Sequence, residues 1–292
     1  MIELHKGKIC AVMTTFSPDN SMLPRVMRVL EQVGHVIIVD DTGTYSHEFS
    51  HDLEKYSVTY VKNVVNSGIA KSLNVGVASA VDLGYQWVLT LDDDSLISET
   101  YVAKLIDFCN KNEKLIGMIG VIALTRGENR NSELELGHHY CDKRAVITSG
   151  SLFHVDVFNS VGGFNEDLFI DLVDFDYCTK LRKKGYKIIQ LPTIGMQHKV
   201  GDSVVKNIFG FSVTIYNHAP FRLYYQVRNP FLFFKINFMF DPYLSCYFLL
   251  DIFRIPLKTL FFECQKIKRL GFIFRGLKDG LVGKTGKIIN NM

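Results

Sequence analysis

The stretch "WVLTLDDDS", residues 87–95, runs from an apolar segment straight into three consecutive carboxylates. A short, nearly continuous apolar run predicts a strand that is buried on both faces of a sheet. Side chains two residues apart in a strand share a face, so Asp92 and Asp94 are expected to point the same way. Their mutual repulsion needs a positive partner, and carboxylate oxygens suit Mg²⁺ or Mn²⁺. The stretch therefore predicts a buried strand whose end holds a divalent cation, although Asp93 by itself also fits a solvated helix N-terminus.

The segments around this stretch alternate between predicted strands and predicted helices. The strands are short apolar runs, and the helices carry small and apolar residues at helical spacing. Strands are predicted within residues 8–19, 35–43, 58–68, 85–94 and 115–125, and helices within 24–33, 69–84 and 98–112. This alternation is typical of an α/β fold with a Rossmann-like, mostly parallel sheet and helices on both faces.

Three of the predicted strands end in unusual polar groups. These ends are Thr14-Thr15, Asp40-Asp41 and Asp92-Asp93-Asp94. In open α/β sheets, ligands bind beyond the carboxyl ends of the strands. We therefore expect all three ends to face one ligand site.

Composition and spacing argue against several classes of protein. The chain has 292 residues and a net charge of only +3, which is not typical of a nucleic-acid-binding protein. Its six cysteines form no C-x-x-C pair, so zinc-ribbon and dithiol redox sites are not expected. The N-terminal apolar run is too short for a signal peptide and is interpreted as the first strand. A cytoplasmic protein with reduced thiols is the expected class.

The C-terminal part is basic and rich in aromatic residues. Residues 252–292 contain nine Lys and Arg against two acidic residues. The longest uncharged run in the apolar segment 231–262 is 242–250, far below the roughly 20 residues that span a bilayer, so no transmembrane helix is expected. We predict a catalytic domain over 1–220 and a helical, amphipathic extension over 221–292. This extension is expected either to lie on a membrane surface or to pack on the catalytic body or a second subunit in a homo-oligomer.

An ordered set of motifs resembles the family 2 glycosyltransferases with the GT-A fold. The segment "NVVNSGIAKSLNVGVASAVDLGYQWVLTLDDDS" is similar to their nucleotide-sugar domain, and "GGFNEDLFIDLVDFDYCTKLRKKGYKI", "MQH", "APFRLYYQVRN" and "GLKDGLVGKTGK" continue the resemblance. It therefore covers nearly the whole chain. Within the family, the sequence is most similar to bacterial rhamnosyltransferases of surface polysaccharide synthesis.

The resemblance implies which residues contact the donor. Thr14, Thr15 and Phe16 match a nucleotide-contacting turn. Asp40 and Asp41 match acids that read the pyrimidine base, although either could simply cap its turn. A loop over the sugar diphosphate matches Asn66, Gly68, Ile69 and Ala70.

The resemblance also implies a metal site and a general base. Asp92 and Asp94 match the D-x-D pair, with Asp94 the direct ligand and Asp93 the middle position beside the donor; His198 matches a histidine of the metal shell. The base matches Asp174, with Asp171 and Asp176 as alternatives or as acids at a helix N-terminus. Val173 replaces the acid that more often precedes the base. Finally, Arg222, Arg228 and Asn229 are expected to contact a phosphate, or their arginine stems to cover apolar surface.

These features predict an inverting, metal-dependent glycosyltransferase. The expected donor is dTDP-L-rhamnose, and the expected acceptor is a growing, lipid-linked glycan of O-antigen, capsule or another cell-surface polysaccharide. The expected location is the inner face of the cytoplasmic membrane. Two alternatives stay open: a related enzyme that uses UDP-galactofuranose or UDP-glucose, and a non-catalytic nucleotide-sugar-binding subunit of an assembly complex.

Overall fold

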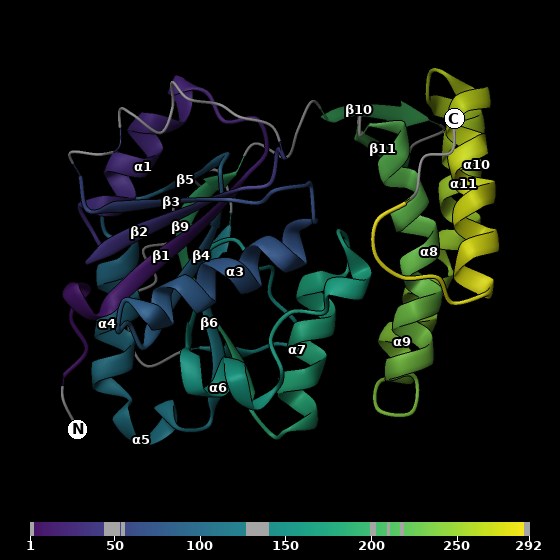
Figure 1. The fold of residues 1–292 in the computed structure, drawn as a ribbon. Helices are drawn as coiled ribbons and strands as arrows, with labels where there is room; N and C mark the ends of the chain where they lie inside the picture. The colour runs from purple at the N-terminus through teal and green to yellow at the C-terminus, as the bar shows by residue number, and fades with distance from the viewer. Residues whose placement is uncertain are drawn as a thin grey trace. The chain divides into compact units, whose positions relative to one another are not determined.

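The computed structural model describes residues 3–43, 53, 56–126, 140–198, 203–208, 211–216 and 219–288. The chain forms two compact units (Figure 1). The first unit contains Met1–Asn165 and Tyr177–His198, and the second contains Glu166–Asp176 and Lys199–Met292. The predicted boundary near residue 220 falls inside the second unit, whose C-terminal part begins at Lys199. A short internal segment, Glu166–Asp176, belongs to the same unit. The functional division at that boundary stays a prediction.

The first unit is built on a mixed sheet with nine strands among the described residues. The strand order is β3-β2-β1-β4-β8-β6-β9-β5, and β7 pairs with β9. The strands are β1 (Ile9–Thr15), β2 (His35–Asp40), β3 (Val58–Lys62), β4 (Trp87–Asp92), β5 (Ser95–Ile97), β6 (Ile119–Arg126), β7 (Cys141–Asp142), β8 (Ser151–His154) and β9 (Lys187–His198). Strands β3, β2, β1 and β4 run parallel, as predicted, whereas β8 and β5 pair antiparallel with their neighbours.

Helices pack on this sheet through alternating strand residues. The helices of this part of the chain are α1 (Leu23–Leu30), α3 (Ile69–Asp82), α4 (Tyr101–Lys111), α5 (Glu113–Ile116), α6 (Val155–Ser160) and α7 (Val173–Lys183), with short 3-10 turns at Lys6–Lys8 and Asn20–Met22. Ile9, Ala11 and Met13 of β1 join a core with Val26 of α1 and Leu105 of α4. The alternate residues of β1 face the other way, toward α3. The prediction of an α/β fold with helices on both faces is confirmed.

The described part of the second unit contains four helices that follow one another along the chain, and a hairpin. They are α8 (Pro220–Asn237), α9 (Pro242–Leu249), α10 (Asp251–Phe262) and α11 (Lys266–Leu281), with β10 (Ser203–Ile208) paired antiparallel to β11 (Phe211–Tyr216). Leu223 and Val227 of α8 pack against Ile273 of α11. A 3-10 turn at Glu166–Leu168 belongs to the same unit. None of the described helices is both long and apolar enough to cross a membrane.

Gly76 in α3 allows this helix to lie close to the sheet. A Cβ atom at this position would fall 2.2 Å from Val12 Cγ1 and 3.1 Å from Val39 Cγ2, closer than real contacts permit. The small residue therefore sets the distance between α3 and strands β1 and β2, and with it the position of the first turn of α3.

Gly76→Ala is expected to lower the free energy of unfolding by about 1–3 kcal/mol, because Val12 must move to admit the methyl group. Urea denaturation followed by circular dichroism measures the change. Gly117→Ala is a matched control, because Gly117 has an ordinary φ of −63° and a Cβ there meets nothing within 4 Å. Equal stability of the two variants would contradict the packing argument.

Candidate active site

The register of the sheet brings the polar strand ends together. Thr15 of β1 lies opposite Asp40 of β2, and Thr14 of β1 lies opposite Asp92 of β4. Because these neighbouring strands are parallel, their carboxyl ends lie at the same edge. The expectation that the three strand ends meet is therefore confirmed. Phe16, which follows Thr15, is 59% exposed at this edge.

Asp40 is fully buried, and both of its carboxylate oxygens accept hydrogen bonds from the protein. Oδ1 accepts from the backbone N–H of Thr42 at 2.9 Å and from the Thr42 hydroxyl, and Oδ2 accepts from the Tyr60 hydroxyl at 2.5 Å. Burial, together with the Asp40 carboxylate, raises the pKa of Tyr60, so this hydroxyl keeps its proton. Asp40 thus closes the turn after β2, which agrees with the turn-capping interpretation.

Asp41 holds the loop that leads into α3. Its Oδ1 accepts from Asn63 Nδ2 and from the Ser67 backbone N–H, each at 2.7 Å, and its Oδ2 accepts from the Gly68 backbone N–H at 2.7 Å. Gly68 is the N-cap of α3 with φ at +88°, a conformation that L side chains rarely adopt. One carboxylate therefore fixes the predicted diphosphate loop.

The rest of this loop ends at the first turn of α3. Ile69 and Ala70 are the first two residues of the helix, and Ala70 is buried. A helix N-terminus carries free backbone N–H groups and a partial positive charge, which suit a phosphate. The Asn66 Oδ1 atom is buried and has no hydrogen-bond partner within the described residues. The predicted donor-contacting residues Asn66, Gly68, Ile69 and Ala70 therefore form one continuous turn.

Asp93 contacts the end of β1 through its side chain. Its Oδ2 accepts a hydrogen bond of 2.7 Å from the Thr15 hydroxyl, and its backbone oxygen accepts one of 2.5 Å from Arg25 Nε. Burial raises the pKa of the Asp93 carboxyl. This side chain joins the ends of β1 and β4, so its part in the site is to hold the two strand ends together.

Asp92 and Asp94 lie on either side of Asp93 at the end of β4. Asp92 is half-buried and Asp94 is exposed. The pairing of β5 with β9 places the backbone of His198 opposite Ser95, one residue after Asp94. The side chain of His198 is outside the described part of the structure. Within the described residues, no group of three or more His, Cys, Asp or Glu side chains is arranged to hold a metal. Two hard carboxylate oxygen donors, with a histidine backbone beside them, nevertheless fit the ligand chemistry of Mg²⁺ or Mn²⁺.

The second unit contains the acidic loop in which the general base was predicted. This loop, residues 166–176, includes three non-glycine residues with left-handed backbone: Phe169 (φ 64°), Asp171 (φ 64°) and Leu172 (φ 63°). Each such residue costs about 1–2 kcal/mol relative to ordinary backbone. A loop with this much strain needs strong contacts to keep its shape.

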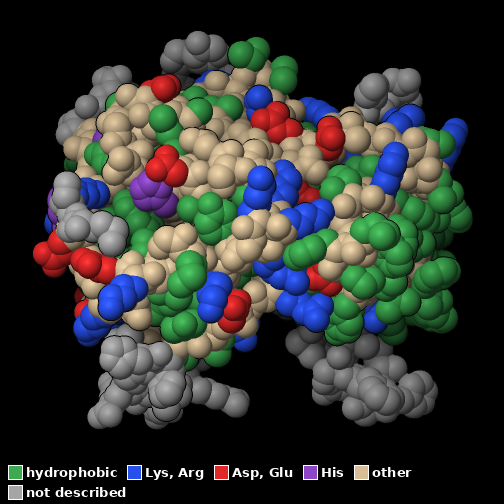
Figure 2. Space-filling model, turned by 90° about the horizontal axis from the view of Figure 1, so that it is seen from below, with side chains coloured by type: hydrophobic (Ala, Val, Ile, Leu, Met, Phe, Trp, Pro, Cys, Tyr) green, Lys and Arg blue, Asp and Glu red, His purple; other side chains and the backbone are tan. Residues whose placement is uncertain are grey.

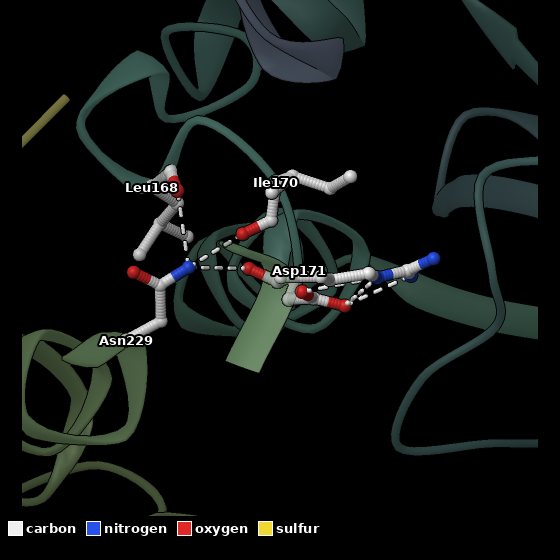
Figure 3. Close-up of polar contacts among 5 residues, drawn as sticks. Leu168, Ile170, Asp171 and Asn229 are labelled. Atoms are coloured by element: carbon white, nitrogen blue, oxygen red, sulfur yellow. Dashed lines mark hydrogen bonds and ion pairs between the residues drawn. The ribbon is translucent and has the colours of Figure 1, made fainter. Parts of the chain in front are cut away.

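Asn229 of α8 supplies one set of these contacts. Its Nδ2 group lies 3.0 Å from the carbonyl oxygen of Leu168, 2.6 Å from that of Ile170 and 2.9 Å from that of Asp171 (Figure 3). An amide nitrogen has two hydrogens, so the three carbonyls share them. One fully buried amide thus holds both sides of the strained turn.

Arg228, the preceding residue, is also fully buried and supplies the second set. Its Nη2 donates to the carbonyls of Asp167 at 3.1 Å and Leu168 at 2.9 Å, and its Nη1 donates to the carbonyl of Gly286. Nε and Nη2 also donate to Asn229 Oδ1 at 2.9 and 2.7 Å, which fixes the orientation of the amide. The phosphate contact expected of Arg228 and Asn229 is therefore wrong in this structure, because their donors are used on backbone carbonyls.

The three candidate acids of this loop have different surroundings. Asp171 forms an ion pair with Arg222, with Nη2 at 2.9 Å and Nε at 3.2 Å from Oδ1. Asp176 is 1% exposed and accepts a 3.1 Å hydrogen bond from Asn237. Asp174, in the first turn of α7, is only half-buried, and its Oδ1 accepts from the neighbouring Phe175 N–H at 2.9 Å. The choice of Asp174 as the base stays a prediction.

The sequence patterns indicated Asp171 and Asp174 but not the residues that shape their loop. Arg228 and Asn229 bond to backbone carbonyls about 60 positions earlier, and such partners leave no trace in the side-chain pattern. The one available signal was an Arg-Asn pair between the apolar residues Val227 and Pro230 of α8, because buried polar groups need partners.

Comparison with known proteins identifies the family. The model of Glycosyl transferase family 2 matches residues 10–167, which contain all three polar strand ends. The chain belongs to this family and is a glycosyltransferase. It is 30% identical over 245 residues to a protein of Shigella flexneri described as dTDP-rhamnosyl transferase RfbF, and the match covers 79% of this chain and 81% of that protein.

Solved structures share the fold at low sequence identity. Residues 1–349 of S. aureus TarS, in complex with UDP-GlcNAc, match with a TM-score of 0.56 and 13% identity over 92% of this chain and 81% of that chain. In another crystal structure of TarS, this chain spans 43% of the TarS chain. GalNAc-T7 with UDP, GalNAc and Mn²⁺ matches with a TM-score of 0.53 and 14% identity over 65% of this chain and 42% of that chain. These likenesses confirm the predicted GT-A fold.

Asn229→Asp is expected to lower the free energy of unfolding by about 1–3 kcal/mol, because a carboxylate would face three carbonyl oxygens that now accept from an N–H. Urea denaturation measures the loss. Gln226→Glu makes the same amide-to-acid change on the half-buried side of α8 and serves as the control. If both variants were equally stable, Asn229 would not be holding the loop.

Proposed function

We propose that this glycosyltransferase moves L-rhamnose from dTDP-L-rhamnose to a growing, lipid-linked cell-surface glycan, with inversion at the sugar carbon. The observation that carries the proposal is the register of the parallel strands β1, β2 and β4. Their carboxyl ends lie side by side, which brings Thr14, Asp40 and Asp92 to one edge of the sheet. The relationship to the Shigella protein supports the choice of donor. The action of the enzyme at the inner face of the cytoplasmic membrane stays part of this proposal.

The donor is proposed to bind at this edge through its three chemical parts. The pyrimidine base lies toward the end of β2, where the slightly exposed Asp41 accepts three hydrogen bonds out of the roughly four acceptor positions of a carboxylate, while the fully buried Asp40 holds the turn. The diphosphate lies along the loop from Asn66 to Ala70, whose helix N-terminus favours anions. Phe16 provides an exposed ring for stacking on the base.

Asp94 and Asp92, with His198, are proposed to hold Mg²⁺ or Mn²⁺. The bound ion would neutralise the charge that develops on the nucleoside diphosphate as it leaves. The crystal structure of GalNAc-T7 contains UDP and Mn²⁺, and its shared fold supports this cofactor. Asp93 contributes by holding Thr15, so that the two flanking carboxylates keep their places.

Asp174 is proposed to act as the general base. Its carboxylate takes the proton of an acceptor hydroxyl while that oxygen forms a bond to C1 of the sugar, and the bond from C1 to the diphosphate oxygen breaks. The surrounding loop needs a fixed shape for this step, since a base works only within hydrogen-bond reach of the proton it removes. The contacts of Arg228 and Asn229 provide that rigidity.

Two other functions are distinguished by one experiment. A related enzyme would use another donor such as UDP-galactofuranose or UDP-glucose, and a non-catalytic subunit would bind a nucleotide sugar without transferring it. The half-buried Asp174 favours catalysis. A panel of nucleotide sugars, each with Mn²⁺, tests donor binding by thermal stabilisation and donor consumption by release of the nucleoside diphosphate. Stabilisation and turnover by dTDP-L-rhamnose support the proposal, whereas preference for a UDP-sugar, or binding without turnover, contradicts it.

Asp94→Asn is expected to reduce transfer at least about 100-fold, because it removes a proposed direct metal ligand. Asp93→Asn is the matched variant: the amide oxygen of asparagine can still accept the hydrogen bond from the Thr15 hydroxyl, so the strand ends stay joined, and activity is expected to stay within about threefold. Initial rates across a Mn²⁺ titration measure both effects. Full activity of the Asp94 variant at low Mn²⁺ would contradict the metal assignment.

Asp174→Asn is expected to lower kcat by about 10²- to 10⁴-fold, because general acid–base catalysis contributes this much, while the Kd of the donor stays unchanged. Rates and calorimetric donor titrations provide the two values. Asp171→Asn is the comparison, and it is expected to act through stability, since it weakens the ion pair with Arg222. A kcat collapse confined to the Asp171 variant would show that the base has been assigned to the wrong residue.

A further inference from the structure

Helices α9 and α10 present a long apolar face to solvent. Its centre is formed by Phe253, Leu257 and Phe261, which are 69%, 55% and 70% exposed, and the side chains of Tyr243 and Tyr247 extend it along α9. Within each helix these residues are four positions apart, a spacing that keeps Tyr243 and Tyr247 on one side of α9, and Phe253, Leu257 and Phe261 on one side of α10. Figure 2 shows a broad field of hydrophobic side chains over the C-terminal helices.

The opposite side of α10 is also apolar, but it is occupied. Ile255 packs against the cluster formed by Leu223, Val227 and Ile273, and Thr259 is fully buried. Helix α10 is therefore hydrophobic on two sides, of which only one has a partner within the described residues. Exposed apolar patches of this kind mark interaction sites, so the exposed side indicates a second contact.

The charged residues of this unit are predominantly basic. Residues 219–288 contain twelve Lys and Arg but four acids. Each of the four acids has a partner inside the unit. Asp241 caps α9 by accepting from the Leu244 N–H at 3.0 Å. The other three form ion pairs: Glu263 with Arg269 at 3.0 Å, Asp279 with Lys284 at 2.9 Å, and Asp251 with Arg254 at 3.5 Å. The exposed positive side chains include Lys235, Arg254, Lys266, Lys268, Lys278, Lys284 and Lys287. The surface of this unit thus combines exposed apolar side chains with a strong excess of positive charge.

We propose that the apolar face of α9 and α10 docks on an anionic lipid bilayer, with both helices lying in the plane of the interface. Amphipathic helices bind in this way when apolar side chains enter the acyl boundary while Lys and Arg contact anionic headgroups. Tyr243 and Tyr247 suit the headgroup level, because each has an apolar ring and a polar hydroxyl. Arg254, stacked over the Tyr247 ring at 5.2 Å, brings a positive charge to the same place.

A second copy of the chain is a poorer partner for this face. A two-fold interface places the same patch of both subunits together, so the two basic surfaces would repel each other. An anionic bilayer instead attracts these charges while it accepts the apolar side chains. Docking is independent of the proposed donor and acceptor, since binding to lipid is measured without either.

Co-sedimentation of the full chain with vesicles tests the proposal. Vesicles rich in phosphatidylglycerol are compared with vesicles of phosphatidylcholine alone, and the partition coefficient is measured at low and high salt. We expect stronger binding to phosphatidylglycerol and weaker binding at high salt, because each basic residue near the surface adds about fivefold. The double variant Phe253→Glu/Phe261→Glu is expected to bind both kinds of vesicle at least about tenfold more weakly.

Val81→Glu/Met118→Glu is the matched control, because it places the same two charges at exposed apolar positions of the first unit. It is expected to bind as the unchanged protein does. Melting temperatures verify that the variants fold. The variant Lys266→Glu/Lys268→Glu provides a second test that leaves the apolar face unchanged, and it is expected to weaken binding only to phosphatidylglycerol vesicles. Equal binding by the phenylalanine variant and its control would overturn the proposal. A second outcome would also overturn it: the unchanged protein does not bind vesicles but forms a dimer, and the phenylalanine variant is monomeric. The apolar face would then bind a second copy of the chain.

Discussion

The parallel pairing of β2, β1 and β4 is the constraint on which the donor edge depends. Parallel strands of a doubly covered sheet must be apolar along their length, so polar chemistry can begin only where they end. The register fixes these ends at one level, with Thr15 opposite Asp40 and Thr14 opposite Asp92. Three unrelated stretches of sequence thereby become neighbours, and the distance between them is set by strand spacing and not by loop conformation.

The same edge concentrates negative charge, and the protein relieves this in three different ways. The carboxylates of Asp40 and Asp41 accept hydrogen bonds from Tyr60, Thr42 and the backbone of the α3 loop, which stabilise their buried charge. Asp93 is bound by the Thr15 hydroxyl, and its raised pKa reflects its burial. Asp94 is exposed at the end of the series. The acids with the most internal contacts thus shape the turns, whereas the more exposed ones suit contact with a cation.

Sequence patterns predicted the first unit well because its signals are local. Apolar runs that end in polar residues marked β1, β2 and β4, and small residues at helical spacing marked α3. The antiparallel positions of β8 and β5 could not be predicted, because a short apolar run carries no information about its partner strand. The role of Asp93 was likewise hidden, since its bond to Thr15 spans 78 positions. The sequence gives no sign of the unit boundary at Asn165, because this boundary falls inside the motif "GGFNEDLFIDLVDFDYC", which has no break in composition.

The second unit shows why Arg and Lys serve different purposes within one basic segment. Arg228 is buried at the turn of the acidic loop, where its planar, five-donor group satisfies several carbonyls at once. Lys266, Lys268 and Lys278, whose charge is compact and strongly hydrated, are exposed. Three left-handed residues in the loop cost about 3–6 kcal/mol in total relative to ordinary backbone, and the contacts of Arg228 and Asn229 offset that cost. The predicted base is therefore held by the same helix that packs against α10 and α11, so the shape of the acidic loop depends on the folding of the C-terminal helices.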